Sequence, residues 1–87
     1  MVTPEEILAF WLDEVGLEGW YKQDDALDQQ IRDRFLTAWE GAIEGRYALW
    51  LTYPGGVLAY IILTDQFPRN MFRGQARAFA TDPASKA

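Results

Sequence analysis

The chain has 87 residues, of which 49% are hydrophobic and 15% aromatic, and its formal net charge is −5. This length predicts one small domain, residues 1–87, and the apolar content excludes a disordered chain. Because cysteine and histidine are both absent, disulfides, thiol nucleophiles and the usual zinc ligands are excluded, and the acidic balance argues against nucleic-acid binding.

The N-terminus has neither a basic stretch nor a signal-like apolar core. The longest apolar run, Val57–Leu63, is far shorter than the roughly 20 residues that a membrane span needs. No calcium-type acidic loop is present, and Asp24, Asp25 and Asp28 are better explained by capping of a helix. We therefore expect a cytoplasmic protein with no metal, no cofactor and no membrane partner.

Two amphipathic helices are predicted in the first half of the chain. Thr3 and Pro4 are typical of a helix start, and apolar residues at helical spacing extend this helix to Val15, with Gly16 as its stop. Residues 16–24 are expected to form a connector. Asp24 or Asp25 then caps a second helix that ends near residues 44–45. Its apolar stripe is Leu27, Ile31, Phe35, Ala38, Trp39, Ala42 and Ile43.

The segment that follows Pro54 is apolar nearly all round. Val57–Leu63 by itself fits either a buried strand or a helix. The spacing of Leu63 and Phe67 and the amphipathic neighbours favour a buried central helix over residues 54–67, which Pro68 would end. A short helix over residues 75–80 and a helix start at residues 82–83 are expected next. The fold class is thus all-α, with three to five helices packed as antiparallel hairpins.

The most distinctive stretch is residues 65–74, where polar side chains follow the most apolar helix. In one interpretation they form a satisfied polar cluster that pins the turn to the core, with Arg69 or Arg73 paired to Asp65. In the other, the arginines present donors to a phosphate or carboxylate, and Asp65 orients them or acts as a base. The candidate residues are Asp65, Gln66, Arg69, Asn70, Arg73 and Arg77.

Charge is unevenly distributed along the chain. Residues 1–64 carry 4 basic and 11 acidic side chains, whereas residues 65–87 carry 4 basic and 2 acidic ones. This local reversal favours an acidic partner for the arginines. In the connector, Trp20 and Tyr21 are candidates for the rim of a cleft.

Several of these residues together resemble one bacterial family. They are Ile7-Leu8, Phe10-Trp11, Trp20-Tyr21, Asp28, Ile31, Phe35, the run Asp65-Gln66-Phe67-Pro68-Arg69-Asn70 with Phe72-Arg73-Gly74, and residues 76–82. The family is domain of unknown function 924, in the tetratricopeptide-like helical superfamily. The resemblance implies stacked helical hairpins in a bacterial cytoplasmic protein, and no established activity. Members are about twice as long, so the chain resembles the N-terminal half of the family fold.

Two functions are compatible with these features. The first is a module that binds another protein or an acidic peptide, and the second is a small-molecule-binding protein or enzyme for an anionic metabolite. If a second half normally covers this one, apolar surface is exposed and the chain is expected to associate with itself, as a dimer.

Overall fold

The computed structural model describes residues 2–20, 24–75 and 78, and helices and turns account for nearly all of them. No strand occurs within these ranges, so the predicted all-α class is confirmed. The ambiguous run Val57–Leu63 is helical.

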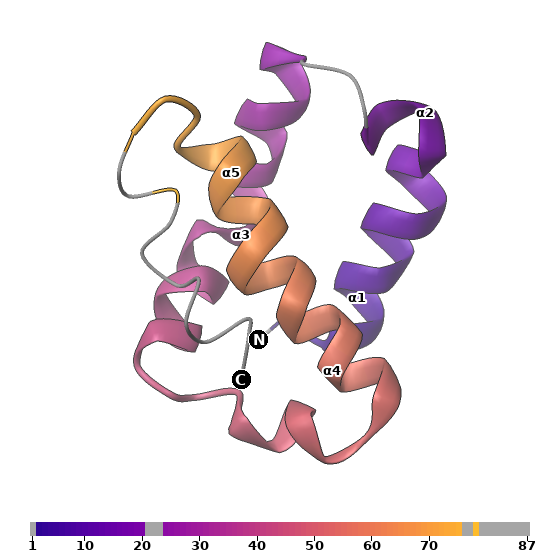
Figure 1. The fold of residues 1–87 in the computed structure, drawn as a ribbon, viewed down its shortest axis with the longest axis vertical. Helices are drawn as coiled ribbons and strands as arrows, with labels where there is room; N and C mark the ends of the chain where they lie inside the picture. The colour runs from indigo at the N-terminus through magenta and orange to yellow at the C-terminus, as the bar shows by residue number, and fades with distance from the viewer. Residues whose placement is uncertain (1, 21–23, 76–77, 79–87) are drawn as a thin grey trace.

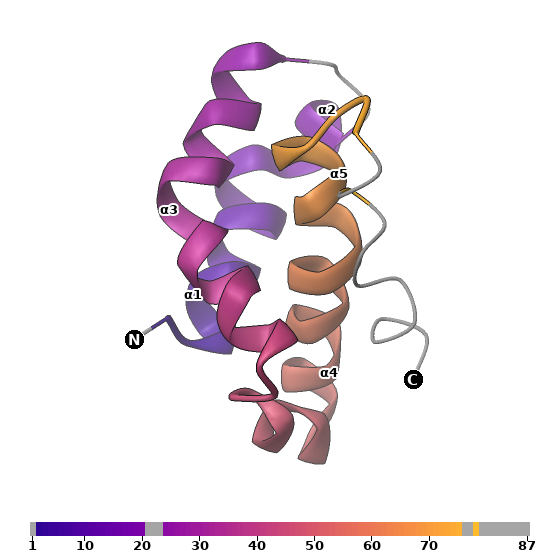
Figure 2. The same cartoon turned by 90° about the vertical axis from the view of Figure 1, so that its left-hand side faces the viewer.

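The described residues form three helical rods (Figure 1). The first consists of α1 (Pro4–Leu8) and the π-helical η1 (Ala9–Val15), after which α2 (Gly16–Trp20) turns off at its end. The second is α3 (Asp25–Ile43). A 3₁₀ turn, η2 (Ala48–Thr52), leads into the third rod, which is α4 (Pro54–Ile61), the π-helical η3 (Ile62–Gln66) and α5 (Phe67–Met71). Consecutive rods run antiparallel, as Figure 2 shows.

The two predicted helix starts are capped as expected. The hydroxyl of Thr3 accepts a hydrogen bond from the amide of Glu6 at 3.2 Å. The carboxylate of Asp24 accepts from the amides of Ala26 and Leu27 at 2.9 and 3.2 Å. These bonds satisfy amides that have no partner inside the helix. The first rod ends at Gly16, whose φ of 71° favours glycine.

Phe67 lies at the centre of the core, where side chains of all three rods meet. Its ring centroid is 4.8 Å from that of Phe35, 5.8 Å from that of Trp11 and 6.1 Å from that of Phe10. All four residues are at most 6% exposed. The segment after Pro54 is thus the central helix that the sequence predicts, and it holds the first two rods together. It is buried on one face only, since Leu58 and Ile61 are 43% and 39% exposed.

Pro68 does not end the third rod, contrary to expectation. The amide of Phe67 donates to the carbonyl of Ile62, five residues earlier, so the turn before the proline is wider than an α-helical one. In a regular α-helix the proline ring would clash with the carbonyl four residues before it. The π-helical turn gives the ring room, and α5 continues with Pro68 in its first turn.

Two other expectations differ from the structure. The connector expected over residues 16–24 contains the short helix α2. Ile43, placed on the buried stripe of α3, is 54% exposed and is the last residue of the helix. The helix start expected at residues 82–83 and most of the helix expected at 75–80 lie outside the described residues.

Among the helices that the structure describes, none combines the length and the hydropathy that crossing a membrane would require.

Candidate functional site

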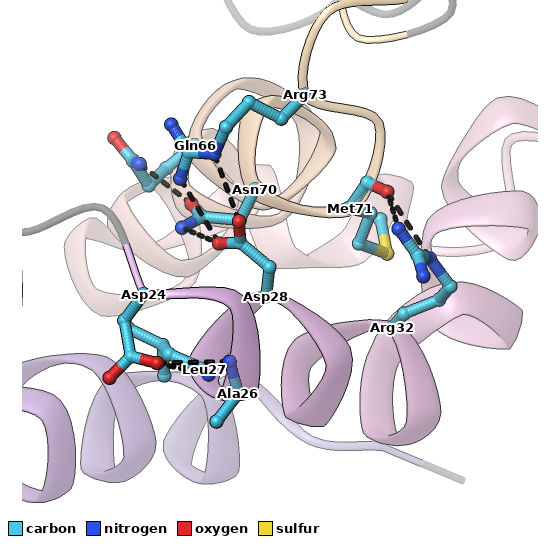
Figure 3. Close-up of polar contacts among 9 residues, drawn as sticks. All are labelled: Asp24, Ala26, Leu27, Asp28, Arg32, Gln66, Asn70, Met71 and Arg73. Carbon is cyan, nitrogen blue, oxygen red and sulfur yellow. Dashed lines mark hydrogen bonds and ion pairs between the residues drawn. The ribbon is translucent and has the colours of Figure 1, made fainter.

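A buried carboxylate, Asp28, lies where α3 packs against α5. Its Oδ1 accepts hydrogen bonds from Nδ2 of Asn70 at 2.9 Å and from Nη2 of Arg73 at 3.0 Å. Its Oδ2 accepts from Nε of Arg73 at 2.9 Å, so the guanidinium holds the carboxylate with two parallel bonds (Figure 3). This bidentate geometry is the strongest form of a carboxylate–arginine pair.

Gln66 supports this cluster from the preceding turn of the third rod. Its Nε2 donates to Oδ1 of Asn70 at 2.8 Å, and that amide in turn donates to Asp28. A continuous chain of hydrogen bonds therefore runs from η3 through α5 to α3. It orients the Asn70 amide, whose nitrogen has to face the carboxylate.

The surroundings of Asp28 act on its pKa in opposite directions. Burial is the largest single effect and raises the pKa, because it removes water from the charged form. The hydrogen bonds from Arg73 and Asn70 and the positive charges of Arg73 and Arg32 together outweigh burial. The pKa of Asp28 is therefore below its usual value, and the carboxylate raises the pKa of Arg73 in return.

Arg32 reaches α5 from the next turn of α3. Its Nε donates to the carbonyl of Met71 at 3.2 Å, Nη2 donates to the same oxygen, and Nη1 donates to Oε1 of Gln29 at 2.9 Å. Met71 ends α5, where carbonyls lack helical partners, so the arginine acts as a cap. All three acceptor contacts of Arg32 are with uncharged groups, and no carboxylate in the described ranges forms an ion pair with it.

These side chains line a surface hollow of about 470 Å³. Its lining, which carries both signs of charge, consists of Asp25, Asp28, Gln29, Arg32, Asn70, Arg73 and Gly74. We refer to it as the polar hollow.

Of the six residues predicted to form a polar site, the structure describes five and places them in two groups. Asn70 and Arg73 line the polar hollow, and Gln66 supports Asn70. Asp65 and Arg69 form their own ion pair at 3.0 Å on the third rod and do not line the hollow. Arg69 and Arg73 were the two partners expected for Asp65. The structure pairs Asp65 with Arg69, whereas Arg73 pairs with Asp28. Arg77 lies outside the described residues.

The central role of Asp28 was not predicted from the sequence. Asp28 was grouped with Asp24 and Asp25, and all three were explained by capping of a helix. Asp24 is indeed the cap, but Asp28 is only 6% exposed. A signal was present in the spacing: Asp28 precedes Ile31 by three residues and Phe35 by seven, so it shares their buried face. Arg32 was missed too, and no feature of the sequence indicates that it reaches the end of α5.

Trp20 is held against the first rod. Its ring stacks on that of Trp11 at 6.0 Å, and its Nε1 donates to the carbonyl of Trp11 at 2.7 Å. It does not line the polar hollow. Tyr21, the other candidate for a cleft rim, lies outside the described residues.

A second hollow, of about 520 Å³, lies over η2 and α4 and has an apolar lining. It is formed by Leu51, Thr52, Tyr53, Pro54, Val57, Leu58 and Ile61, none of which carries a charge. We refer to it as the apolar groove. Leu51, Leu58 and Ile61 are 46%, 43% and 39% exposed, although such residues are usually buried.

Comparisons with known proteins agree with this architecture. The structure is similar to that of a protein of unknown function from Agrobacterium tumefaciens, with a TM-score of 0.88 and 40% sequence identity. The match covers 93% of this chain and 46% of that one, so this chain spans about half the length of the solved relative. No curated protein matches the chain.

A family model described as "Bacterial protein of unknown function (DUF924)" matches residues 7–87, which include the polar hollow and the apolar groove. The resemblance noted in the sequence is thereby confirmed, and the chain belongs to the DUF924 family of bacterial proteins of unknown function.

Proposed function

We propose that this chain is a protein-interaction module of the bacterial cytoplasm and that the apolar groove is its binding face. The observation that carries the proposal is the groove's composition: seven lining residues without a single charge, in a chain with 21 charged side chains. Contiguous exposed apolar surface of this kind is typical of interaction sites, because leaving it in water costs free energy that a partner can recover.

The partner that we propose for the 87-residue chain is a second copy of itself. Each copy is acidic, with a net charge of −5, so most pairs of faces would bring carboxylates together. The apolar groove is a face on which two copies can meet without that repulsion. The solved relative is about twice as long, so additional polypeptide accompanies the same fold there. In the proposed dimer, the helical hairpins of the two copies stack on each other across the groove, as tetratricopeptide-like hairpins do.

Light scattering over a range of protein concentrations tests self-association. We expect the wild-type chain to approach the mass of a dimer and Leu58→Glu to remain a monomer, because the glutamate would place a charge in the buried centre of the interface. Leu17→Glu is the matched control, since Leu17 is 64% exposed on α2 and does not line the groove. It should behave as the wild type does.

A wild-type chain that stays monomeric at the highest concentration would contradict the proposal. Dimers that persist in Leu58→Glu would contradict the choice of the groove as the interface. Circular dichroism establishes that each variant retains its helical fold before its mass is interpreted.

The second candidate function is recognition of an anionic small molecule, and the polar hollow is the observation that favours it. Two arginines line this hollow, and guanidinium groups match carboxylate and phosphate oxygens in geometry. An acidic peptide would use the same donors.

A further inference from the structure

We propose that Arg32 and Arg73 are the two cationic donors of a binding site for a small carboxylate or phosphate ion in the polar hollow, and that Asp25 weakens binding there. This inference rests on the second candidate function and assigns it residues and a ligand class. Arg32 is essential to it, and no feature of the sequence indicated that residue.

Arg32 is the first cation of the hollow. Its hydrogen bonds go to the Met71 carbonyl and the Gln29 amide oxygen, neither of which is charged. These bonds fix the direction of the guanidinium without neutralising it. Its charge also acts on Asp28, but that carboxylate bonds to Arg73, and no carboxylate in the described part of the chain forms an ion pair with Arg32. A positive charge held in this way at the edge of a hollow attracts anions from solution.

Arg73 is the second cation of the hollow. Asp28 engages its Nε and Nη2, and no hydrogen bond from Nη1 is found among the described residues. Its side chain is 40% exposed and lines the hollow. Because Asp28 holds the inner edge with two bonds, little conformational entropy remains to be lost when an anion binds the outer edge.

The charges that line the hollow nearly balance. Asp28 pairs with Arg73, while Arg32 acts on Asp28 and Asp25 acts on Arg73 at longer range. One positive charge, on Arg32, and one negative charge, on the exposed Asp25, therefore lie outside the pair. The two opposite charges make the hollow nearly neutral overall. Affinity for an anion is therefore modest, and removal of the Asp25 charge should increase it.

The ligand class follows from the donors and the volume. A space of about 470 Å³ accommodates phosphate or a small dicarboxylate. Planar guanidinium edges favour oxyanions over spherical ions such as chloride. Free metabolites and the carboxylates of a peptide share this chemistry, so the test compares inorganic phosphate, succinate and a peptide that ends in two glutamates.

Isothermal titration calorimetry of the full chain with each probe, at constant ionic strength in chloride, tests the proposal. We expect phosphate or succinate to bind at one site per chain. Arg32→Gln should weaken binding roughly tenfold or more, since a charge-assisted contact is lost while an amide remains to cap Met71. Asp25→Asn should tighten binding several-fold. Tighter binding of the peptide than of succinate would identify a protein partner as the source of the carboxylate.

Arg46→Gln is the control of matched charge, because Arg46 pairs with Glu44 on an exposed turn and does not line the hollow. Its affinity should equal that of the wild type. If no probe binds the wild type, the second candidate function itself is wrong. If a probe binds but Arg32→Gln and Asp25→Asn leave its affinity unchanged, that function survives and the assignment of residues is wrong.

Discussion

Asp28 shows how one residue can determine the geometry of a whole contact. A carboxylate that is buried without partners destabilises a protein strongly, so its cost has to be offset locally. Here three donor groups supply the offset: the side-chain amide of Asn70, which lies on α5, and two guanidinium nitrogens of Arg73, two residues beyond its end. The same bonds fix the positions of Asn70 and Arg73, so the order of the polar hollow depends on this carboxylate.

Replacement of Asp28 by asparagine should lower the free energy of unfolding by about 1–3 kcal/mol at neutral pH, because the charge-assisted bonds to Arg73 are lost. This expected loss in the free energy of unfolding is smaller than the loss for a fully buried pair, since Arg73 is partly exposed and water can solvate it. Urea unfolding at pH 7 measures the change. Asp33→Asn, an exposed acid on the same helix, is the control and should cost less.

The lowered pKa of Asp28 adds a pH dependence with a definite sign. A carboxylate whose pKa is lower in the folded state stabilises the protein fully above its unfolded pKa, about 3.9, and this stabilisation is lost as the pH falls through the folded value. The stability difference between wild type and Asp28→Asn should therefore shrink in acid. A difference that stays constant from pH 7 to pH 2 would show that the pair contributes no pH-dependent stability.

At the scale of elements, the packing of η2 on α4 depends on a glycine. A Cβ atom on Gly56 would overlap the carbonyl oxygen of Trp50 and come within 2.9 Å of its Cα. These are backbone atoms, which cannot move aside as the end of a flexible side chain can. The close approach of the two elements is thus possible only without a side chain at position 56.

Gly56→Ala should destabilise the protein by about 1–3 kcal/mol, the usual cost of overpacking, in thermal or urea unfolding. Gly55→Ala is a control from the same turn, because the nearest atom to its added Cβ is a Tyr53 ring carbon at 3.6 Å. Alanine also has a higher helix propensity than glycine, so Gly55→Ala should leave stability unchanged or raise it by up to about 1 kcal/mol. Equal losses in both variants would contradict the role assigned to the contact.

The elements also show what the sequence could predict. Capping residues predicted the starts of α1 and α3, and Pro54 that of α4, because these signals are local. The continuation through Pro68 was not predictable, since it depends on a π-helical turn that core packing selects. The site was predicted in part: residues 65–74 were recognised as polar, but their partners Asp28 and Arg32 are about 40 residues away in sequence.

At the scale of the whole molecule, stability depends on the few side chains that join separate rods. Phe67 is the clearest case, because its ring meets rings from η1 and α3 and is completely buried. A chain of this length buries a smaller share of its surface than a larger domain does, so it has little stability to spare.

Phe67→Ala should therefore reduce the free energy of unfolding by about 3–5 kcal/mol, the usual cost of a buried phenylalanine and much of the stability of a small domain. Near-ultraviolet circular dichroism, which reports the packing of the tryptophans, should show loss of fixed tertiary structure. Leu49→Ala, at a side chain that is 79% exposed, should change stability by less than about 0.5 kcal/mol. Retention of the wild-type spectrum by Phe67→Ala would contradict this role of the ring.

The pairing of Asp28 with Asn70 and Arg73 also has a consequence for synthesis on the ribosome. The partners follow the aspartate by 42 and 45 residues. At bacterial translation rates of about 5–20 residues per second, this separation corresponds to roughly 2–9 s. During that interval nascent α3 carries an unmatched carboxylate beside the exposed faces of Ile31 and Phe35. The arrival of α5 supplies the Phe67 ring that packs on Phe35, together with the Asn70 donor for Asp28, and Arg73 follows two residues later.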